Sequence, residues 1–334
     1  MQEFKNKSIL VTGGTGSFGK ECVRNILKQN KANRVVVFSR DEQKQYEMSK
    51  QFPETKYPKI RYFLGDIRDY TRLELACSGI DIIIHAAAIK IVSSAEYNPT
   101  ECILTNIIGA QNIIQASIKN NVKKVIALST DKAANPINLY GATKLCSDKL
   151  FVAANNLSGK VKTKFSVVRY GNVVASRGSV IPYFKQLLLD GKKKLPLTNK
   201  EMTRFFITLE QGVKFVLNSV KNMSGGEIFV PKLYSIRILD LIEVMAGKGN
   251  FDIVGIRPGE KIHEVMIPRE ESLNCIDMKD HYIIQPMFSW WNTKQLKKNL
   301  KNKGKRITES FEYASNTNKK WFKEKEIIKL LKSI

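Results

Sequence analysis

Hydrophobic residues in the first half of the chain gather in short runs, separated by longer stretches in which they repeat at helical spacing. The runs are rich in valine and isoleucine and cover residues 9–12, 35–38, 60–64, 82–84, 125–128 and 165–168. Uniformly apolar strands are typical of a parallel sheet that is covered by helices on both faces. Between the first two runs, helical spacing of apolar residues predicts a helix packed on the sheet by Phe18, Cys22, Val23, Ile26 and Leu27. The pattern therefore predicts a doubly wound α/β fold.

The pattern is looser after residue 170. It predicts a helix over residues 182–189, a strand over 228–230 and a helix over 238–245, joined by loops that contain arginine and glycine. Short elements of this kind suit a smaller lobe over a site made by the first half. We expect residues 1–170 to form a dinucleotide-binding domain and residues 171–334 to form mainly a smaller C-terminal substrate-binding lobe. This division allows the chain to cross back from one lobe to the other.

Three glycines follow the first predicted strand in the sequence TGGTGSFG at residues 12–19, and a predicted helix begins directly after them. Gly13 allows a tight turn, Gly16 lets the backbone approach a pyrophosphate, and Gly19 lets the helix pack closely on the strand. The unpaired N–H groups at the amino end of the helix favour an anion. The arrangement predicts a Rossmann-type dinucleotide site; the alternative is a glycine-rich turn without a ligand.

The second predicted strand ends in Ser39, which Arg40 and Asp41 follow. Sites that prefer NAD usually place an acidic residue here, whereas Ser39 cannot repel a phosphate, and Arg40 and Lys44 suit a 2′-phosphate. NADP is therefore the predicted cofactor. Asp41 either binds the ribose or, as we favour, caps the next helix. Asp66, after the third strand, either accepts a hydrogen bond from the adenine amino group or caps the helix that follows it.

Tyr140 and Lys144 follow the fifth predicted strand and share one face of a helix. A free tyrosine has a pKa of about 10, and a nearby ammonium favours the phenolate that alcohol oxidation near neutral pH requires. Asp131 and Lys132, at the end of the same strand, add an acid and a potential base. Alternatively, Asp131 and Lys132 form an exposed salt-bridged loop and Lys144 coats the surface.

Five segments together resemble one protein family: residues 12–19, HAAAIK at 85–90, STDKAANPINLYGATK at 129–144, RYGN at 169–172 and RPGEK at 257–261. They are similar to extended short-chain dehydrogenase/reductases and, within these, to the inverting UDP-N-acetylglucosamine 4,6-dehydratases that begin pseudaminic acid synthesis. The resemblance implies bound NADP, UDP-N-acetylglucosamine as substrate, UDP-2-acetamido-2,6-dideoxy-β-L-arabino-hex-4-ulose as product, a homo-oligomer, namely a hexamer, and a link to flagellin glycosylation.

The resemblance also implies the residues of the site. The implied catalytic residues are Thr130, Asp131, Lys132, Tyr140 and Lys144. The implied cofactor-binding residues are Gly13, Thr15, Gly16, Ser17, Phe18, Gly19, Ser39, Arg40, Asp41, Lys44, Asp66, Ile67, Ala86, Lys90, Tyr140, Lys144 and Val173. The implied substrate-binding residues are Lys90, Asn172, Val180, Thr198, Arg204, Arg257 and Glu260, and the arginines, with Arg169, suit a diphosphate.

A 4,6-dehydratase uses the acid and base beside the tyrosine. Tyr140 deprotonates the C4 hydroxyl as hydride leaves C4, and Thr130 binds the C4 oxygen. Lys132 then removes the acidified C5 proton, and Asp131 protonates the departing C6 hydroxyl; hydride returns to C6, and protonation of C5 on the opposite face inverts it. Related dehydratases of nucleotide-linked glucose carry glutamate in place of Lys132, and simple 4-epimerases lack the acid–base pair. Membrane-anchored retaining relatives carry methionine in place of Tyr140.

Two other classes of function stay open: a nucleotide-sugar 4-epimerase or reductase on the same scaffold, and a non-catalytic protein that binds NADP or nucleic acid. Some positions depart from the family pattern. Ile91 stands where histidine is expected, Ser93 and Ser94 where proline is expected, and Ala175 where glycine is expected. These departures concern the shape of local loops and not the reaction class.

Composition excludes several classes of protein. Hydrophobic residues make up 43% and charged residues 26% of the 334 residues, which are ordinary globular values. The formal net charge of +24 lies partly in clusters at 192–194 and 297–306, which predict solvated faces because no aromatic residues interleave with them. Five single cysteines and three scattered histidines predict no disulfide framework and no metal site, and no apolar run reaches the ~20 residues of a membrane span. We expect a cytoplasmic enzyme that binds neither nucleic acid nor membrane.

Overall fold

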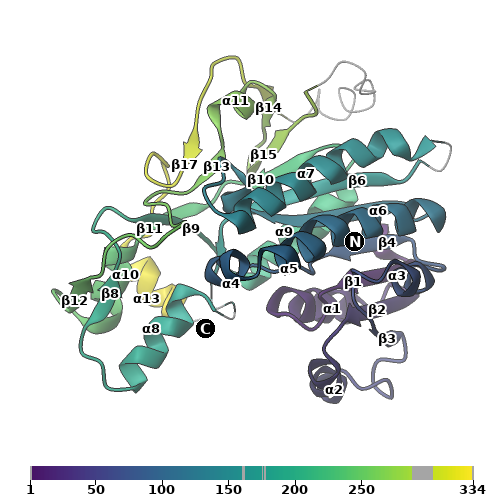
Figure 1. The fold of residues 1–334 in the computed structure, drawn as a ribbon, viewed down its shortest axis with the longest axis horizontal. Helices are drawn as coiled ribbons and strands as arrows, with labels where there is room; N and C mark the ends of the chain where they lie inside the picture. The colour runs from purple at the N-terminus through teal and green to yellow at the C-terminus, as the bar shows by residue number, and fades with distance from the viewer. Residues whose placement is uncertain (1, 160–161, 175, 177, 288–303, 333–334) are drawn as a thin grey trace.

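The centre of the protein is a ten-stranded sheet in a computed structural model that describes residues 2–159, 162–174, 176, 178–287 and 304–332 (Figure 1). Its strands are β1 (Ser8–Thr12), β2 (Arg34–Ser39), β3 (Ile60–Leu64), β4 (Ile82–His85), β5 (Lys124–Thr130), β6 (Lys164–Tyr170), β10 (Ile228–Pro231), β14 (Cys275–Asp277), β15 (His281–Ile284) and β16 (Lys305–Arg306). The order is β3-β2-β1-β4-β5-β6-β10-β15-β14-β16. The seven strands from β3 to β10 are parallel, and the last three are antiparallel to their neighbours. The order of the first six is that of a Rossmann sheet, so the predicted fold class is confirmed.

The six predicted strands of the first half all occur, each within two residues of its predicted ends. The strand predicted over 228–230 is β10, but it does not lie in the smaller lobe. It pairs in parallel with β6 and extends the central sheet. The chain therefore crosses back to the first lobe after residue 170, and the domain boundary at that residue stays a prediction.

Helices cover both faces of the sheet (Figure 1). The helical segments of this part are η1 (Gln2–Phe4), α1 (Ser17–Gln29), α2 (Glu42–Gln51), α3 (Tyr70–Ala76), α4 (Val92–Tyr97), α5 (Pro99–Ile103), the π-helical turn η2 (Leu104–Ile108), α6 (Gly109–Lys119), the 3-10 turn η3 (Asp131–Ala133), α7 (Leu139–Leu157) and α9 (Leu209–Asn222). Helices α3, α6 and α7 are neighbours on one face, and α1 packs on α9 on the other. The helix predicted from apolar spacing is α1, in which Cys22, Val23, Ile26 and Leu27 are buried and Phe18 is partly buried.

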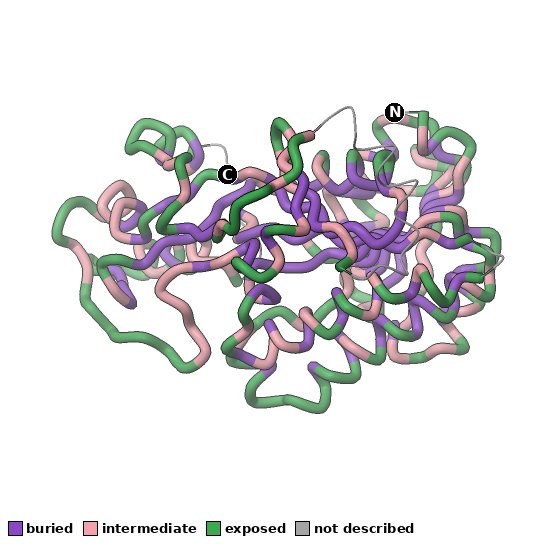
Figure 2. The backbone as a smooth tube through the Cα atoms, turned by 90° about the horizontal axis from the view of Figure 1, so that it is seen from above, coloured by how far each residue is buried: buried purple, intermediate pink, exposed green. Residues whose placement is uncertain are grey.

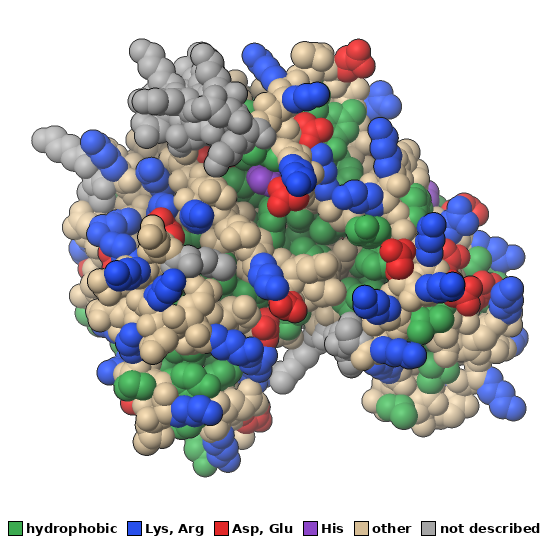
Figure 3. All heavy atoms as spheres, turned by 180° about the vertical axis from the view of Figure 1, so that it is seen from behind, with side chains coloured by type: hydrophobic (Ala, Val, Ile, Leu, Met, Phe, Trp, Pro, Cys, Tyr) green, Lys and Arg blue, Asp and Glu red, His purple; other side chains and the backbone are tan. Residues whose placement is uncertain are grey.

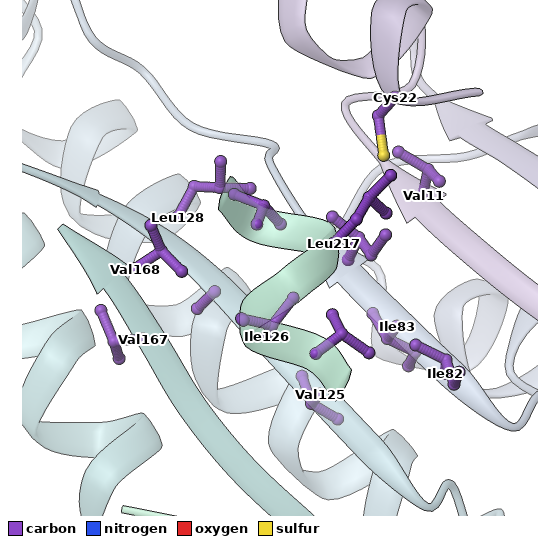
Figure 4. Packing of buried hydrophobic residues seen from close by; sticks show 14 of the residues in the cluster. Val11, Cys22, Ile82, Ile83, Val125, Ile126, Leu128, Val167, Val168 and Leu217 are labelled. Carbon is purple, nitrogen blue, oxygen red and sulfur yellow. The ribbon is translucent and has the colours of Figure 1, made fainter. Parts of the chain in front are cut away.

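The main core lies between the sheet and these helices. Leu217 of α9 lies near Val11 of β1, Cys22 of α1 and Ile126 of β5, all of them buried (Figure 4). Figure 2 shows that buried residues follow the central strands while exposed residues occupy the outer loops. This packed layer fixes the carboxyl ends of the strands, where the loops of the site begin.

A smaller lobe has its own core and lies at one end of the molecule (Figure 1). Its elements are β7 (Asn172–Val173), α8 (Val180–Leu189), β8 (Leu195–Leu197), β9 (Thr203–Ile207), β11 (Tyr234–Arg237), α10 (Ile238–Ala246), β12 (Phe251–Ile253) and α13 (Glu324–Lys332). The helices predicted over 182–189 and 238–245 are α8 and α10, so both are confirmed. Between the lobes, β13 (Val265–Ile267) pairs antiparallel with β17 (Tyr313–Ala314), and the short helix α11 (Arg269–Ser272) follows β13.

The surface carries the basic excess in dispersed form. Lysine and arginine side chains are spread over the face in Figure 3, with acidic side chains among them. Lys192, Lys193 and Lys194 are exposed, as predicted for a solvated face. Residues 297–303 of the second predicted cluster lie outside the described residues. Within the described part of the chain, no helix is both long enough and apolar enough to cross a bilayer.

Candidate active site

A cavity of about 740 Å³ lies at the carboxyl ends of the parallel strands β1, β2, β4, β5 and β6. This volume is within the range of small-molecule and cofactor sites. All of the predicted cofactor-binding residues line the cavity, from Gly13 in the first loop to Val173 in β7, and so do the five predicted catalytic residues. Their functions stay predictions, but the structure brings all of them together in one site.

The glycine loop after β1 has the backbone geometry of a phosphate site. Gly13 has a φ of +62°, and a Cβ there would lie 2.8 Å from the backbone nitrogen of Ala87. A Cβ on Gly19 would lie 2.4 Å from the carbonyl oxygen of Gly13, so the tight turn and the close helix–strand contact are confirmed. Helix α1 begins after Gly16 without a side-chain cap. Its first N–H groups are therefore available to an anion, and the loop fits a dinucleotide pyrophosphate.

The adenosine end of the cavity carries basic side chains. Ser39, Arg40 and Lys44 line it, and the Arg40 guanidinium is mostly exposed, with Nη1 3.7 Å from Oδ2 of Asp66. Asp41 caps α2, because its Oδ1 accepts a hydrogen bond of 2.9 Å from the backbone N–H of Lys44. The favoured interpretation of Asp41 as a helix cap is therefore confirmed.

Asp66 does not cap the helix that follows it. The cap of α3 is Asp69, whose side chain accepts from the backbone N–H of Arg72, so that alternative for Asp66 was wrong. Asp66 instead accepts hydrogen bonds from the backbone N–H and the guanidinium of Arg68. Partial burial raises the pKa of Asp66, but the bonds from Arg68 outweigh it and hold the pKa below its usual value. The carboxylate therefore stays charged at the edge of the cavity.

Asp131 is a buried acid at the end of β5, with 1% of its surface exposed. Its Oδ1 accepts hydrogen bonds from the Thr130 hydroxyl at 2.9 Å and from Nζ of Lys132 at 3.1 Å. Its Oδ2 has no hydrogen-bond partner among the described residues. Burial raises the pKa of Asp131 more than the Lys132 charge lowers it. The interpretation of this pair as an exposed loop was therefore wrong.

Lys132 lies between two carboxyl groups. Its Nζ is 3.1 Å from Oδ1 of Asp131 and 3.0 Å from Oε1 of Glu264. Burial lowers the pKa of Lys132, but the two carboxylates outweigh burial and raise it above its usual value. In this state Lys132 is an ammonium ion, so it has to lose a proton before it can act as a base.

Tyr140 and Lys144 lie in the first two turns of helix α7 and line the same cavity. Burial raises the pKa of Tyr140 to about 12, and the charge of Lys132 and a hydrogen bond with Thr130 oppose this rise. Lys144 is buried, and burial lowers its pKa while Asp148 raises it. The interpretation that Lys144 coats the surface was therefore wrong. Lys132 joins the acid–base pair to the tyrosine electrostatically, a link that helical spacing alone does not reveal.

The sequence comparison decides the family. Residues 9–286 match the protein family described as Polysaccharide biosynthesis protein. A protein of Campylobacter jejuni subsp. jejuni serotype O:2, named UDP-N-acetylglucosamine 4,6-dehydratase (inverting), is 52% identical over 334 residues, which are 98% of this chain and 98% of that protein. The chain therefore belongs to the Polysaccharide biosynthesis protein family. The resemblance to extended short-chain dehydrogenase/reductases is confirmed.

Other relatives of the family differ in their names. A protein of Rickettsia massiliae named UDP-glucose 4-epimerase is 40% identical over 84% of this chain and 83% of its own length. The crystal structure of Pen from Bacillus thuringiensis superposes with a TM-score of 0.89 at 37% identity and covers 99% of this chain and 98% of that chain. DesIV, a dTDP-glucose 4,6-dehydratase from Streptomyces venezuelae solved with NAD and TYD bound, has a TM-score of 0.68 at 24% identity over 76% of this chain and 86% of that chain, and supports the fold alone.

The predicted substrate-binding residues divide into two groups. Lys90 and Asn172 line the cavity, whereas Val180, Thr198, Arg204, Arg257 and Glu260 are outside its lining. The guanidinium of Arg204 is buried and donates to the carbonyl oxygens of Thr203, Ile262 and Lys261. Glu260 accepts a hydrogen bond of 3.3 Å from the Thr198 hydroxyl. The contacts of Arg204 and Thr198 connect the loop at 257–264 to the smaller lobe.

Arg169 does not face the cavity. It is fully buried, and its guanidinium donates to Glu271 at 2.7 Å and to Asp148 at 3.4 Å. The expectation that this arginine suits a diphosphate was therefore wrong, because its guanidinium is already paired with two carboxylates inside the core. Of the departures from the family pattern, Ile91 lines the cavity, Ser93 and Ser94 lie in α4, and Ala175 lies outside the described residues.

Sequence reasoning missed Glu264. It lies three residues after the end of the RPGEK segment, and its carboxylate contacts the predicted base. No local pattern in the sequence indicates this contact, because Glu264 and Lys132 are far apart in the chain and meet through the packing of β13 beside η3. A buried carboxylate next to a catalytic lysine therefore has to be found from the fold.

Proposed function

We propose that the chain is a UDP-N-acetylglucosamine 4,6-dehydratase that inverts C5 and forms UDP-2-acetamido-2,6-dideoxy-β-L-arabino-hex-4-ulose. The observation that carries the proposal is the ion pair of buried Asp131 with partly buried Lys132, in the same cavity as Tyr140 and the glycine loop. Alcohol oxidation requires only the tyrosine, whereas elimination of water also requires an acid and a base. The name of the 52% identical relative supports the same reaction.

NADP is the proposed cofactor. The glycine loop and the amino end of α1 suit its pyrophosphate, and the cationic Arg40 and Lys44 beside the neutral Ser39 suit a 2′-phosphate. In this structure Arg40 contacts Asp66 and Lys44 contacts Asp41, so a phosphate would share these cations with two carboxylates. Bound NADP supplies reversible storage of a hydride between C4 and C6 of the hexose.

Tyr140 is the proposed base for the C4 hydroxyl. Its phenol needs to lose its proton near neutral pH, and the charge of Lys132 and the Thr130 hydroxyl both favour the phenolate. Thr130 donates its hydroxyl proton to Asp131 in this structure. Once Asp131 is protonated, the same hydroxyl can donate to the C4 oxygen, which carries the negative charge as the carbonyl reacts.

Lys132 and Asp131 carry out the elimination. A proton first moves from Nζ of Lys132 to Oδ1 of Asp131, 3.1 Å away, and gives a neutral amine and a carboxylic acid. The amine then takes the C5 proton, the C5–C6 double bond forms, and the C6–O bond breaks. Asp131 gives its proton to the departing hydroxyl, which leaves as water, and the original ion pair is restored. Burial of Asp131 favours its protonated form and so supports its function as the acid.

Two residues inside the cavity, Lys90 and Asn172, are the proposed contacts for the sugar of the substrate. The Oδ1 atom of Asn172 is buried and has no hydrogen-bond partner among the described residues, which suits a hydroxyl or amide of the sugar. Val180, Thr198, Arg204, Arg257 and Glu260 remain proposed contacts for the distant part of the nucleotide sugar. Return of the hydride to C6 leaves an enolate, and its C5 takes a proton from solvent on the face opposite Lys132, which gives the inverted product. Tyr140 releases the proton that it took from the C4 hydroxyl, so the steps sum to the loss of one water.

The wider role follows from the family resemblance alone. We propose that the product is the first intermediate of pseudaminic acid synthesis, which serves flagellin glycosylation, and that the enzyme is a cytoplasmic homo-oligomer, namely a hexamer. We also propose that it binds neither nucleic acid nor membrane. Size measurement in solution and binding to DNA at physiological salt test these statements.

One experiment separates the two candidate reactions. Purified protein is incubated with UDP-N-acetylglucosamine, and the products are followed by NMR. A dehydratase gives a new methyl signal and a ketone hydrate, whereas a 4-epimerase changes only the ring couplings. The epimerase is the second candidate because the 40% identical relative bears that name. Ring-coupling changes without a methyl signal would exclude the dehydratase.

A further inference from the structure

A buried glutamate stands behind the proposed base. Glu264 is 1% exposed and directly precedes β13. Its Oε1 lies 3.0 Å from Nζ of Lys132 and 3.7 Å from Nε of Arg204. Its Oε2 is buried without a hydrogen-bond partner among the described residues. A buried charge of this kind is retained only where cations offset its loss of hydration.

The backbone of Glu264 is held by the C-terminal part of the chain. The N–H of Glu264 donates to the Ser315 hydroxyl at 2.9 Å, and its carbonyl oxygen accepts from the Ser315 N–H at 2.8 Å. The Ser315 hydroxyl is in turn 2.6 Å from that of Thr203 in β9. These bonds hold the backbone of residue 264 in place beside Lys132.

Asp131 and Glu264 share one ammonium ion. Lys132 contacts an oxygen of each carboxyl group, while the other oxygen of each is buried and unpartnered among the described residues. Burial raises the pKa of Glu264, but Lys132 and Arg204 outweigh burial and hold the pKa below its usual value. Glu264 is therefore the permanent anion of the cluster. The proton that moves belongs to Lys132 and Asp131.

We infer that Glu264 is a positioning residue: it holds Nζ of Lys132 at the hexose and, as a fixed negative charge, sets the pH range in which the Asp131–Lys132 pair carries the single proton needed for elimination. This inference rests on the proposed dehydratase function. It assigns to Glu264 no contact with substrate or cofactor.

The sign of the charge effect is defined. A negative charge favours the protonated form of both neighbours, so Glu264 raises the pKa of Asp131 and that of Lys132. The pair gains a second proton on the acid side of its active range and loses its proton on the alkaline side. The charged and titratable groups that act on the cluster are Lys132 and Asp131 of η3, Arg204 of β9, Lys261 of the adjoining loop, and Tyr140 of α7. His263 and Glu260 of the same loop interact with Arg204. Removing the glutamate charge therefore moves both limbs of the pH profile toward acid.

The test compares the pH profiles of kcat for dehydration in the wild-type enzyme and in Glu264→Gln, with the NMR methyl signal as the measure of product. We expect both limbs of the Gln profile to move toward acid by about one pH unit. We also expect kcat at the optimum to fall by about 10²-fold, because Lys132 loses one of its two anchors. A Gln profile that keeps the wild-type position would overturn the function assigned to Glu264.

Two further variants separate charge from position. Glu264→Asp keeps the charge but shortens the side chain, and Ser315→Ala removes the hydroxyl that holds the backbone of residue 264. We expect both to lower kcat and leave the profile near its wild-type position, and they keep the test available if the Gln variant does not fold. An equal acid shift in all three variants would contradict the inference.

A matched control removes another paired carboxylate. Glu271→Gln takes a partly buried carboxylate from the buried Arg169 but not from Lys132. It should lower stability without moving the profile. Wild-type protein that forms no methyl product would overturn the proposed function itself. Wild-type protein that turns over, together with an unmoved Gln profile, would overturn only the inference about Glu264.

Discussion

A Cβ on Gly141 would lie 2.2 Å from the carbonyl oxygen of Lys132. Gly141 follows Tyr140 in α7, and Lys132 belongs to η3 at the end of β5. The absence of a side chain therefore lets the helix that carries the tyrosine pack directly against the turn that carries the acid and the base. A second bond fixes the start of α7, since the Asn138 side chain accepts from the Gly141 N–H at 2.8 Å. The contact between Gly141 and Lys132 therefore sets the distance between the tyrosine proposed for oxidation and the acid and base proposed for elimination.

The first prediction concerns that contact. Gly141→Ala should push η3 away from α7, because the contacted atom is backbone and cannot rotate aside. Overpacking of this kind costs about 1–3 kcal/mol of unfolding free energy, and the displaced Lys132 should lower dehydration by about 10²-fold. Urea denaturation and the NMR assay measure the two effects. Gly212→Ala in α9 is the control, since its Cβ would meet Ile207 at 3.9 Å, an ordinary contact. Equal behaviour of the two variants would refute the prediction.

The second prediction concerns Lys132. Lys132→Ala should keep bound cofactor and lose product by about 10²–10⁴-fold, because no amine remains to take the C5 proton. Oxidation at C4 should also slow near neutral pH and recover at higher pH, since Lys132 lowers the pKa of Tyr140. Absorbance of the reduced nicotinamide reports the first step and NMR the second. Lys149→Ala is the control: it is a largely exposed lysine on the same helix as Tyr140. Undiminished product formation in Lys132→Ala would remove the proposed base.

The fold was predictable from local pattern because most of the parallel strands are largely apolar and because Gly13 and Gly19 of the first loop have no room for a side chain. The site was predictable as far as its residues lie in the loops that follow β1, β2, β4 and β5. Pairings between distant segments were not predictable. Arg169 and Arg204 look alike in the sequence as candidates for a diphosphate, and only the fold reveals that Arg169 is paired with Asp148 and Glu271. The contact of Glu264 with Lys132 is likewise set by packing of β13.

The third prediction concerns cofactor choice. Arg40 is mostly exposed at the adenosine end of the cavity, where its guanidinium can pair with a 2′-phosphate. Arg40→Ala should weaken NADP binding by about 10-fold or more and leave NAD binding nearly unchanged, because NAD lacks that phosphate. Calorimetric titration of the cofactor-free protein with each dinucleotide measures both affinities. Arg61→Ala, an exposed arginine of β3 outside the cavity lining, should change neither. Equal losses for NAD and NADP would assign Arg40 to another part of the cofactor.

The last prediction concerns stability against acid. His85 ends β4, is 1% exposed, and has Nδ1 2.8 Å from the Thr12 hydroxyl. Burial, aided by the charge of Lys144, lowers the pKa of His85 to about 3. The unfolded chain has a histidine pKa of about 6.5, so between these two values the unfolded state binds the proton that the folded state refuses. Stability is therefore full above pH ~6.5 and falls as the pH is lowered toward 3.

The difference between the folded and unfolded pKa values of His85 sets how much the unfolding free energy depends on pH. Between pH 7 and pH 5 the unfolding free energy should fall by about 2 kcal/mol through His85 alone. In His85→Gln this contribution is absent, while the carboxylates that also respond to acid are unchanged. Urea denaturation at the two pH values should therefore give a smaller loss for the variant than for the wild type, by about 2 kcal/mol, even if the variant is less stable at both. Identical losses in the two proteins would mean that His85 binds a proton in the folded state, and that its bond to Thr12 does not require the neutral ring.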